Sequence, residues 1–430
     1  MKNILQLILK YLAKTILWRH KPVVVAVTGS VGKTGTKAAI ATVLRQSFFV
    51  WENSGNYNNE IGTPLAILGS ESPGKNIFLW IKVFIRFLYL LVTPRYPQVL
   101  VLEMAADRRG DIKYLTTIAR PHIAVVTRIS EAHTEFLGDL ESVQREKAEL
   151  VRALPHGGVA ILNADDHRVM AMKNLFFGNT ISFGLREDAV VRAVDIRTRQ
   201  EADSNLKNPE QAIGLNFKIK SRGTSRSVFI PGVVGRANVY VLLSAFAVGL
   251  KFGLKPDEIV NAFVNFSPPP GRLRPLAGIK HTVIIDDTYN SSPEAAFESL
   301  RALTEVKGRR RIAVLGDMLE LGEFTESSHR KLGRMVKDLR LDLLFTVGAR
   351  AKFIADEARK RKFGKTKIRE FNSSIEAAVP IQNRLKEGDV VLVKGSQGIR
   401  MERIVLEIID DPERASELLC RQSRDWLRKF

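Results

Sequence analysis

Residues 23–40 read VVVAVTGSVGKTGTKAAI, and this stretch decides how the chain begins to fold. Its first five residues are apolar and mostly β-branched, which predicts a buried parallel strand over residues 23–27. A glycine-rich turn follows, and the alanines and leucine of residues 37–45 predict a helix behind it. A strand, a glycine turn and a helix in this order suit phosphate binding, because backbone N–H groups and the positive helix end converge on one anion.

The turn, which we term the phosphate loop (residues 29–35, GSVGKTG), carries the groups that ATP binding requires. Lys33 can reach the terminal phosphates, and the Thr34 hydroxyl can hold a magnesium ion. Two residues separate the glycines where the common motif has four, but the flanking strand and helix match that motif. We therefore expect ATP and Mg²⁺ as cofactors, with ATP contacted by Gly29, Ser30, Val31, Gly32, Lys33, Thr34 and Gly35.

Composition and charge narrow the class of protein. With 430 residues, 45% of them hydrophobic, the chain can form two or three domains with substantial cores. The formal net charge of +20 fits acidic small molecules, an anionic membrane surface or nucleic acid. No zinc-finger, basic-zipper or RNA-binding signature accompanies this charge, so we expect no nucleic acid partner. The single cysteine, Cys420, excludes an intrachain disulfide and predicts a reducing, cytoplasmic location.

Polar residues follow further apolar runs, which predict more strands of the same sheet. Residues 99–102 end at Glu103, and residues 123–126 are followed shortly by His133. Parallel α/β sheets place their chemistry at the carboxyl ends of strands. We therefore expect Glu103 and His133 to hold a second magnesium ion beside the one at Thr34. Between the phosphate loop and these strands lies an asparagine-rich run, GNYNNEIGTPL, whose substrate-binding residues we expect to be Asn56, Asn58 and Asn59.

The second half of the chain changes pattern twice. A period of two in residues 189–230 predicts a small antiparallel sheet, and residues 268–271, PPPG, indicate a domain boundary. Apolar runs beyond it, at residues 283–285, 312–315, 343–347 and 390–393, predict a second α/β unit. This unit has no phosphate loop of its own, so we expect it to close over the ATP of the first.

Several blocks resemble, in order, the signature blocks of the Mur ligases. They are GSVGKTGTK, GNYNNEIGTPLAIL, LEMAADRRGDI, EAHTEFLGDLESVQREKAEL, LNADD, PGRL, IDDTYNSSPEA, LGDMLELGEFTESSHRKLG and VLVKGS, within residues 23–408. They are most similar to the members that add D-alanyl-D-alanine to a UDP-N-acetylmuramoyl-tripeptide. The resemblance implies a reaction of peptidoglycan synthesis in which ATP phosphorylates a peptide carboxylate and an incoming amine attacks the acyl phosphate.

The resemblance also implies an architecture: an α/β chain with a central ATPase domain at 21–274 and a Rossmann-like domain at 275–430. The pattern of residues 1–20 themselves predicts a basic amphipathic helix before these domains. The resemblance implies catalytic roles for Lys33, His133 and Lys147, the last being the lysine that the family carbamylates with carbon dioxide. A carbamylated Lys147 would join Thr34, Glu103 and His133 as a magnesium ligand. Further contacts are implied at Arg272, Asp287 and Asn290 for the nucleotide, and at Lys394 and Ser396 for the substrates.

The chain departs from the family pattern at several places. Members of this type begin with a UDP-binding domain of about 80 residues, the scale of a small domain, whereas about twenty residues precede the first strand here. Gly35, Arg128 and Ser292 replace polar residues of the pattern, and a histidine and an asparagine expected near Ala237 and Val241 are absent. We expect an active, monomeric ligase with an altered acceptor site. The alternatives are another Mur-type or folylpolyglutamate ligase, and a membrane-associated nucleotide-binding protein that has lost turnover.

Two basic, apolar segments have no counterpart in that pattern. Residues 1–20 form an amphipathic helix in our prediction, and residues 77–92 carry Lys82 and Arg86 one helical turn apart. Sixteen residues with two cations fall short of the ~20 that a membrane-spanning helix needs. We expect the two segments to pack together as a platform for the acceptor, with weak peripheral membrane contact in addition.

Overall fold

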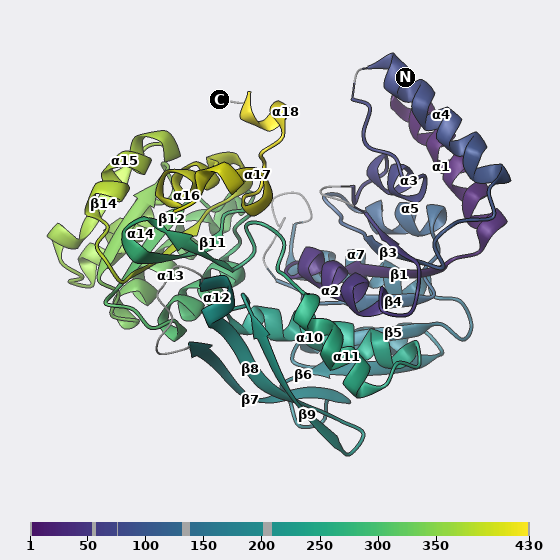
Figure 1. Ribbon diagram of the computed structural model, residues 1–430, viewed down its shortest axis with the longest axis horizontal. Coiled ribbons are helices and arrows are strands. Elements are labelled where there is room, and N and C mark those ends of the chain that lie inside the picture. The colour runs from purple at the N-terminus through teal and green to yellow at the C-terminus, as the bar shows by residue number, and fades with distance from the viewer. Residues whose placement is uncertain (1, 54–56, 75, 131–137, 201–208, 429–430) are drawn as a thin grey trace.

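The computed structural model describes residues 2–53, 57–74, 76–130, 138–200 and 209–428, which fold around two sheets. Figure 1 shows the two sheets side by side, with the N-terminal helices at one end of the molecule and the second sheet at the other. The α/β class predicted from the sequence is confirmed. The domain boundary at residues 274 and 275 stays a prediction.

The first sheet has nine strands in the order β2-β3-β1-β4-β5-β6-β7-β8-β9. Its strands are β1 (Val23–Thr28), β2 (Val50–Glu52), β3 (Val99–Glu103), β4 (Ile123–Val126), β5 (Val159–Asn163), β6 (Asn179–Gly184), β7 (Val191–Gln200), β8 (Ile213–Ser221) and β9 (Thr224–Pro231). Strands β1 to β6 are parallel, whereas β8 runs antiparallel to its neighbours β7 and β9. The predicted antiparallel sheet is therefore present, but it continues the parallel sheet because β7 also pairs with β6.

Helices cover both faces of this sheet. They are α1 (Lys2–His20), α2 (Lys33–Leu44), α3 (Gly62–Ile67), α4 (Ile77–Val92), α5 (Asp111–Ile118), α7 (Leu140–Arg152), α8 (His167–Met170), α9 (Pro209–Ala212), α10 (Arg236–Lys251) and α11 (Pro256–Ala262). Alternate residues of β1 enter different cores, as the pleat of a strand requires. Val25 and Val27 pack with α2 and α10, while Val24 and Ala26 pack with α1, α4, α5 and α7. Helix α2 begins at Lys33, four residues before the predicted start, because the glycine turn leads directly into it.

The second sheet has six strands in the order β10-β11-β15-β12-β13-β14. They are β10 (Arg274–Gly278), β11 (Thr282–Asp287), β12 (Arg310–Gly316), β13 (Leu343–Val347), β14 (Ile368–Phe371) and β15 (Asp389–Lys394), and only β10 runs antiparallel. The accompanying helices are α12 (Pro293–Glu305), α13 (Thr325–Asp338), α14 (Lys352–Lys360), α15 (Ser374–Arg384), α16 (Glu402–Ile408), α17 (Ala415–Leu418) and α18 (Arg424–Leu427). The four predicted strands are confirmed, whereas the shorter β10 and β14 were not predicted.

Candidate active site

The phosphate loop is anchored on the neighbouring strand β4. Gly29 has a φ of 142°, and a Cβ atom there would come within 2.0 Å of the Thr127 hydroxyl, so only glycine fits. The Thr127 hydroxyl donates a hydrogen bond to the carbonyl of Val31 (2.6 Å), and the Ser30 amide donates to the carbonyl of Arg128 (2.7 Å). These bonds fix the loop at the carboxyl end of the sheet.

Lys33 folds back over its own loop. Its ammonium donates hydrogen bonds to the carbonyls of Gly29 (2.8 Å) and Ser30 (3.2 Å). Removal from water lowers the pKa of Lys33, nearby Glu103 opposes this shift, and the positive charge of Arg272 adds to it. A polyanion bound at the loop would favour the charged amine, since an opposite charge within a few ångströms stabilises it.

Glu103 lies directly beside the loop, because it pairs in register with Val27 of β1. One of its carboxylate oxygens accepts a hydrogen bond from the side-chain amide of Asn58 (3.0 Å). The other oxygen is buried and has no hydrogen-bond partner in the described part of the chain. An orphaned buried carboxylate oxygen is costly unless something occupies it, and it is the kind of ligand that Mg²⁺ prefers.

The described residues hold no group of three or more His, Cys, Asp and Glu side chains that could bind a metal ion. The two predicted donors that they place at the loop are the Glu103 carboxylate and the Thr34 hydroxyl, which line one cavity together with Asp107. His133, the third predicted ligand, lies outside the described residues. The donor set is chemically suited to magnesium, because both of its members are hard oxygen ligands.

The side chain of Lys147 is buried in the protein interior. It lies on α7 with 2% of its surface exposed. Burial lowers its pKa to about 7, and the positive charge of Lys33 adds to the shift. The preceding residue, Glu146, accepts hydrogen bonds from the amides of Gly110 (2.7 Å) and Ile112 (2.8 Å), which hold α7 against the start of α5. Near neutral pH a large share of Lys147 is therefore an uncharged amine.

The second sheet contributes a buried ion pair. Asp287 ends β11, Lys394 ends β15, and the two residues are in register. The Lys394 ammonium donates to the Asp287 carboxylate (2.5 Å) and to the carbonyl of Asn290 (3.0 Å). Burial lowers the pKa of Lys394, and the Asp287 carboxylate opposes that shift. The pair thus holds the loop after β11 in place.

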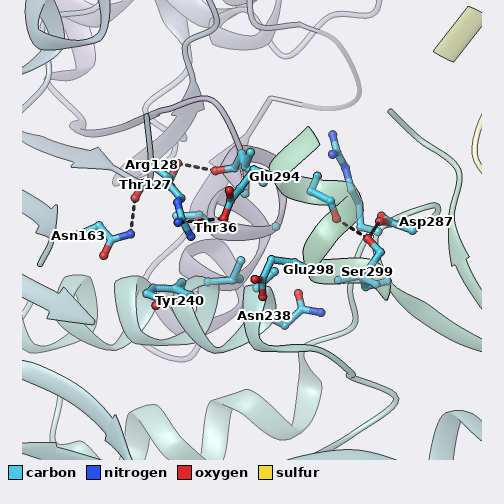
Figure 2. Close-up of a pocket in the computed structure, with 18 of the residues that line it drawn as sticks. Thr36, Thr127, Arg128, Asn163, Asn238, Tyr240, Asp287, Glu294, Glu298 and Ser299 are labelled. Atoms are coloured by element: carbon cyan, nitrogen blue, oxygen red, sulfur yellow. Dashed lines mark hydrogen bonds and ion pairs between the residues drawn. The ribbon is translucent and has the colours of Figure 1, made fainter. Parts of the chain in front are cut away.

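Two arginines connect the sheets on either side of the phosphate loop. Arg272, just before β10, donates to the Thr34 hydroxyl (3.3 Å), and its guanidinium lies 4.1 Å from the centre of the Tyr289 ring. Arg128 forms an ion pair with Glu294 of α12 (2.9 Å), which Figure 2 shows across the pocket. Residues far apart in the sequence therefore meet at the loop.

Two cavities open on this region. One is mostly apolar and contains Gly35, Tyr240 and Val241 among its lining residues (Figure 2). The other is wider and more polar, and Lys33, Thr34, Glu103, Asn58, Asn59, Asn290 and Ser396 line it. Val31, Gly32 and Arg272 line both, so the phosphate loop joins the two cavities.

Comparison with known proteins places this arrangement in a family. Residues 85–249 match the model of the Mur ligase middle domain, and residues 271–397 match that of the Mur ligase, glutamate ligase domain. The chain is 30% identical over 405 residues to the UDP-N-acetylmuramoyl-tripeptide–D-alanyl-D-alanine ligase of Bacillus subtilis (strain 168), covering 94% of this chain and 79% of the relative. The chain belongs to the Mur ligase family. The Escherichia coli (strain K12) protein of the same name is 28% identical, with 89% and 76% covered.

Solved structures of Mur ligases are similar along most of this chain. MurF from Acinetobacter baumannii superposes with a TM-score of 0.77 at 26% identity, covering 94% of this chain and 80% of the other. MurF ligase from Thermotoga maritima, in complex with ADP, also superposes with a TM-score of 0.77, at 27% identity, covering 95% of this chain and 84% of the other.

The site of this Mur ligase gathers most of the residues that the sequence singled out, while their individual roles stay predictions. Asn56 and His133 lie outside the described residues. Asn58 contacts Glu103, and the side chain of Asn59 accepts from the amide of Gly62 (2.8 Å) at the start of α3. Both asparagines therefore organise the site as well as lining it. Ser396 donates to the carbonyl of Ser291 (3.2 Å) on the other side.

Three polar residues of this Mur ligase were missed. Asn53, fully buried, exchanges hydrogen bonds with the backbone of Glu103 (2.9 and 3.2 Å), and Thr127 anchors the phosphate loop. Tyr240 lines the apolar cavity, and its hydroxyl donates to Asp165 (2.8 Å). Asn53 and Thr127 each follow a short apolar run, so the strand-end rule that found Glu103 could have found them. Tyr240 lies within a helix, where no such signal exists.

The predicted acceptor platform finds no support. Helices α1 and α4 do pack together, as expected, and Gln6 contacts Glu60 near the asparagine run (3.0 Å). However, Lys82 and Arg86 line neither cavity at the phosphate loop. Arg86 points inward, with its guanidinium 5.7 Å from the Trp51 ring, so the two cations do not form one exposed stripe.

Proposed function

We propose that this Mur ligase adds D-alanyl-D-alanine to a UDP-N-acetylmuramoyl-tripeptide at the expense of ATP, as the names of its relatives state for them. The observation that carries the proposal is the meeting of the phosphate loop, Glu103 and the loops of the second sheet around one polar cavity. A reaction that joins two substrates and ATP needs such a junction between domains.

The proposed chemistry has two steps. A carboxylate oxygen of the tripeptide attacks the γ-phosphorus of ATP, so that ADP leaves and an acyl phosphate forms. The amine of D-alanyl-D-alanine then attacks the acyl carbon, phosphate leaves with its oxygen, and the nitrogen loses a proton. Lys33 and Arg272 stand where charge accumulates on the transferring group, and fixed positive charge is the main contribution that a protein makes to phosphoryl transfer.

We place the nucleoside of ATP in the apolar cavity beside Tyr240 and Val241, and the substrates in the polar cavity (Figure 2). The two cavities share Val31, Gly32, Arg272 and Ala295, so the phosphates would lie at their junction. A largely apolar pocket with a few polar groups suits an aromatic base. The predicted contacts of Asp287 and Asn290 would then lie on the second sheet's side of the nucleotide.

Magnesium fits the donors that the chain offers. Thr34 would hold one ion, and the orphaned oxygen of Glu103 would hold a second, for which the sequence predicts His133 as a further ligand. A bound magnesium ion supplies positive charge to phosphate oxygens. Asn58 fixes the orientation of the Glu103 carboxylate and thereby keeps one oxygen directed away from its amide.

Lys147 is proposed to carry a carbamate in the active enzyme. Its neutral amine would attack carbon dioxide and release one proton, which converts a buried cation into a carboxylate. Two features support this: the side chain is buried on α7, and its pKa lies at about 7. At pH 7 an ordinary exposed lysine is almost entirely protonated.

The test of the proposed function is phosphate release in the presence of ATP and Mg²⁺ with a panel of acceptors and amines. We expect release to require both a UDP-muramoyl-tripeptide and D-alanyl-D-alanine, and to produce the joined peptide. Release with L-amino acids or glutamate in place of the dipeptide would assign the chain to a different reaction of the family. The cytoplasmic location and monomeric state that the sequence predicts belong to the same proposal.

A further inference from the structure

The outward faces of α1 and α4 are apolar, which is unusual for helices at a protein surface. More than half of the exposed large apolar side chains of the described residues lie on these two helices. On α4 they follow helical spacing at Ile81, Phe84, Ile85, Leu88 and Val92, and therefore share one face. The opposite face, with Val83 and Leu90, packs on the core.

Helix α1 repeats this arrangement. Its inner face, with Leu9, Ala13 and Ile16, is fully buried. Its outer face carries Ile4, Leu7, Ile8, Tyr11 and Trp18, and the indole of Trp18 is 76% exposed. The residues fall on one side of a helical projection, opposite the buried set.

The two helices form a single surface. They lie side by side at the end of the molecule away from the second sheet (Figure 1). Their C-terminal ends are tied together, since the imidazole of His20 hydrogen-bonds the carbonyl of Leu90 (2.8 Å) and stacks on Tyr96 with centroids 4.5 Å apart. Both helices pack on the same core, so both apolar faces point away from it. A contiguous apolar patch of this kind marks an interaction site.

The charges carried by these two helices all have one sign. Neither α1 nor α4 contains an aspartate or a glutamate, whereas Lys14, Arg19 and Lys82 are exposed on them. A pocket at the C-terminal end of α1 adds to this charge: Lys14, Lys21 and Arg120 line it beside Trp18, and no acidic residue does so in the described part of the chain. A basic pocket next to an exposed tryptophan suits an anionic headgroup above an apolar phase.

We infer that α1 and α4 form a docking surface for an anionic lipid bilayer, with the apolar faces in the interface and the pocket of Lys14, Lys21 and Arg120 on lipid phosphates. Among the described residues no helix is long and apolar enough to span a membrane, so the contact is with one leaflet. A second copy of the chain would set cations against cations, which costs energy, whereas anionic lipid neutralises them. The inference does not depend on the reaction that the enzyme performs.

The experiment measures flotation of the full chain with vesicles of phosphatidylglycerol and phosphatidylethanolamine, and with vesicles of phosphatidylcholine alone. We expect binding to the anionic vesicles, weakened by salt, since surface charges are screened. Ile81→Asp with Ile85→Asp should weaken binding by at least about tenfold, because two charges would have to enter the apolar layer. Tryptophan fluorescence should shift to the blue on binding, and Trp18→Phe should reduce that shift.

A matched control is available on α15. Ile375→Asp with Val379→Asp changes two residues at the same helical spacing and of similar exposure (62% and 51%, against 50% and 60% for Ile81 and Ile85), and should leave vesicle binding unchanged. All variants change exposed residues, and circular dichroism with ADP binding checks that each is folded.

Charge is tested separately. Lys14→Glu with Lys82→Glu should lower affinity for anionic vesicles by at least roughly tenfold, while Lys331→Glu with Lys360→Glu, on helices of the second sheet, should not. Absence of vesicle binding by the unaltered chain would overturn the inference. A dimer that Ile81→Asp with Ile85→Asp dissociates, seen by light scattering, would overturn it in favour of a contact between copies.

Discussion

The proposed carbamylation of Lys147 has consequences that can be measured. Lys147→Ala removes the amine while leaving α7 its other anchors, the bonds from Gly110 and Ile112 to Glu146. We expect the variant to fold and bind ADP, but to lose at least about a hundredfold in kcat, since a carboxylate that orients the site would be missing. Acetate should restore part of the activity. Lys113→Ala, at an exposed lysine of α5, is the control and should keep full activity.

The environment of the Lys147 amine determines how much of it is in the neutral form that reacts with carbon dioxide. With a pKa of about 7 instead of 10.5, Lys147 is roughly 90% neutral at pH 8, against well under 1% for an exposed lysine. The reactive form is thus enriched by a few hundredfold. Carbon-13 NMR with labelled carbon dioxide should show a carbamate signal in the unaltered enzyme and in Lys113→Ala, and none in Lys147→Ala. A fully active enzyme without that signal would refute the reasoning.

The same pKa predicts how stability depends on pH in buffer free of carbon dioxide. Between pH 7 and 10.5 the unfolded state holds one proton on Lys147 that the folded state lacks, so the free energy of unfolding rises with pH. The slope is at most about 1.4 kcal/mol per pH unit. Below pH 7 both states are protonated and the penalty of burial is constant. Between pH 7.5 and 8.5, Lys147→Met should therefore show a smaller slope in urea unfolding than the unaltered chain, and equal slopes would place the pKa elsewhere.

Three further variants test other parts of the site. Lys33→Ala should abolish phosphate release, because the phosphate loop loses its only side-chain cation. Near-normal release would mean that ATP does not bind at this loop. Arg128→Ala should raise the KM for ATP severalfold. Because the pair of Arg128 with Glu294 is half-exposed, the same variant should change the free energy of unfolding by less than about 1 kcal/mol. If Arg128→Ala combined with Glu294→Ala raises the KM for ATP more than either single variant does, the two residues act separately. Asp287→Asn leaves Lys394 buried without its counter-charge and should cost roughly 3–5 kcal/mol in urea unfolding, and an unchanged value would contradict the buried pair.

Sequence reasoning succeeded where local chemistry decides the structure. The apolar run at residues 23–27 could only be a buried strand, and Gly29 and Lys33 follow it at the spacing that a phosphate loop needs. Glu103 was found by the strand-end rule, which holds because parallel strands end at one edge. These features depend on residues that are close in sequence or on a general property of parallel sheets.

Sequence reasoning failed where contacts between segments far apart in the chain decide the structure. The sequence showed Arg128 only as a departure from a family pattern, and its pairing with Glu294 depends on the placement of α12. Residues 77–92 are apolar on every side except that of Lys82 and Arg86, so periodicity could not tell which apolar side would face the core. The side chain of Asn58 reaches Glu103, which lies 45 residues further along the chain, while its contact with substrate stays a prediction. Neither the partner nor the direction of such a side chain is encoded by spacing.

The most direct test of the proposed acyl-phosphate mechanism traces an oxygen atom from the tripeptide carboxylate into the released phosphate. The UDP-muramoyl-tripeptide, labelled with oxygen-18 in its terminal carboxylate, is incubated with ATP, Mg²⁺, D-alanyl-D-alanine and the enzyme. We expect one labelled oxygen in each released phosphate, formed in step with the joined peptide and only when the dipeptide is present. Unlabelled phosphate, or release that ignores D-alanyl-D-alanine, would contradict an acyl-phosphate ligase at this site.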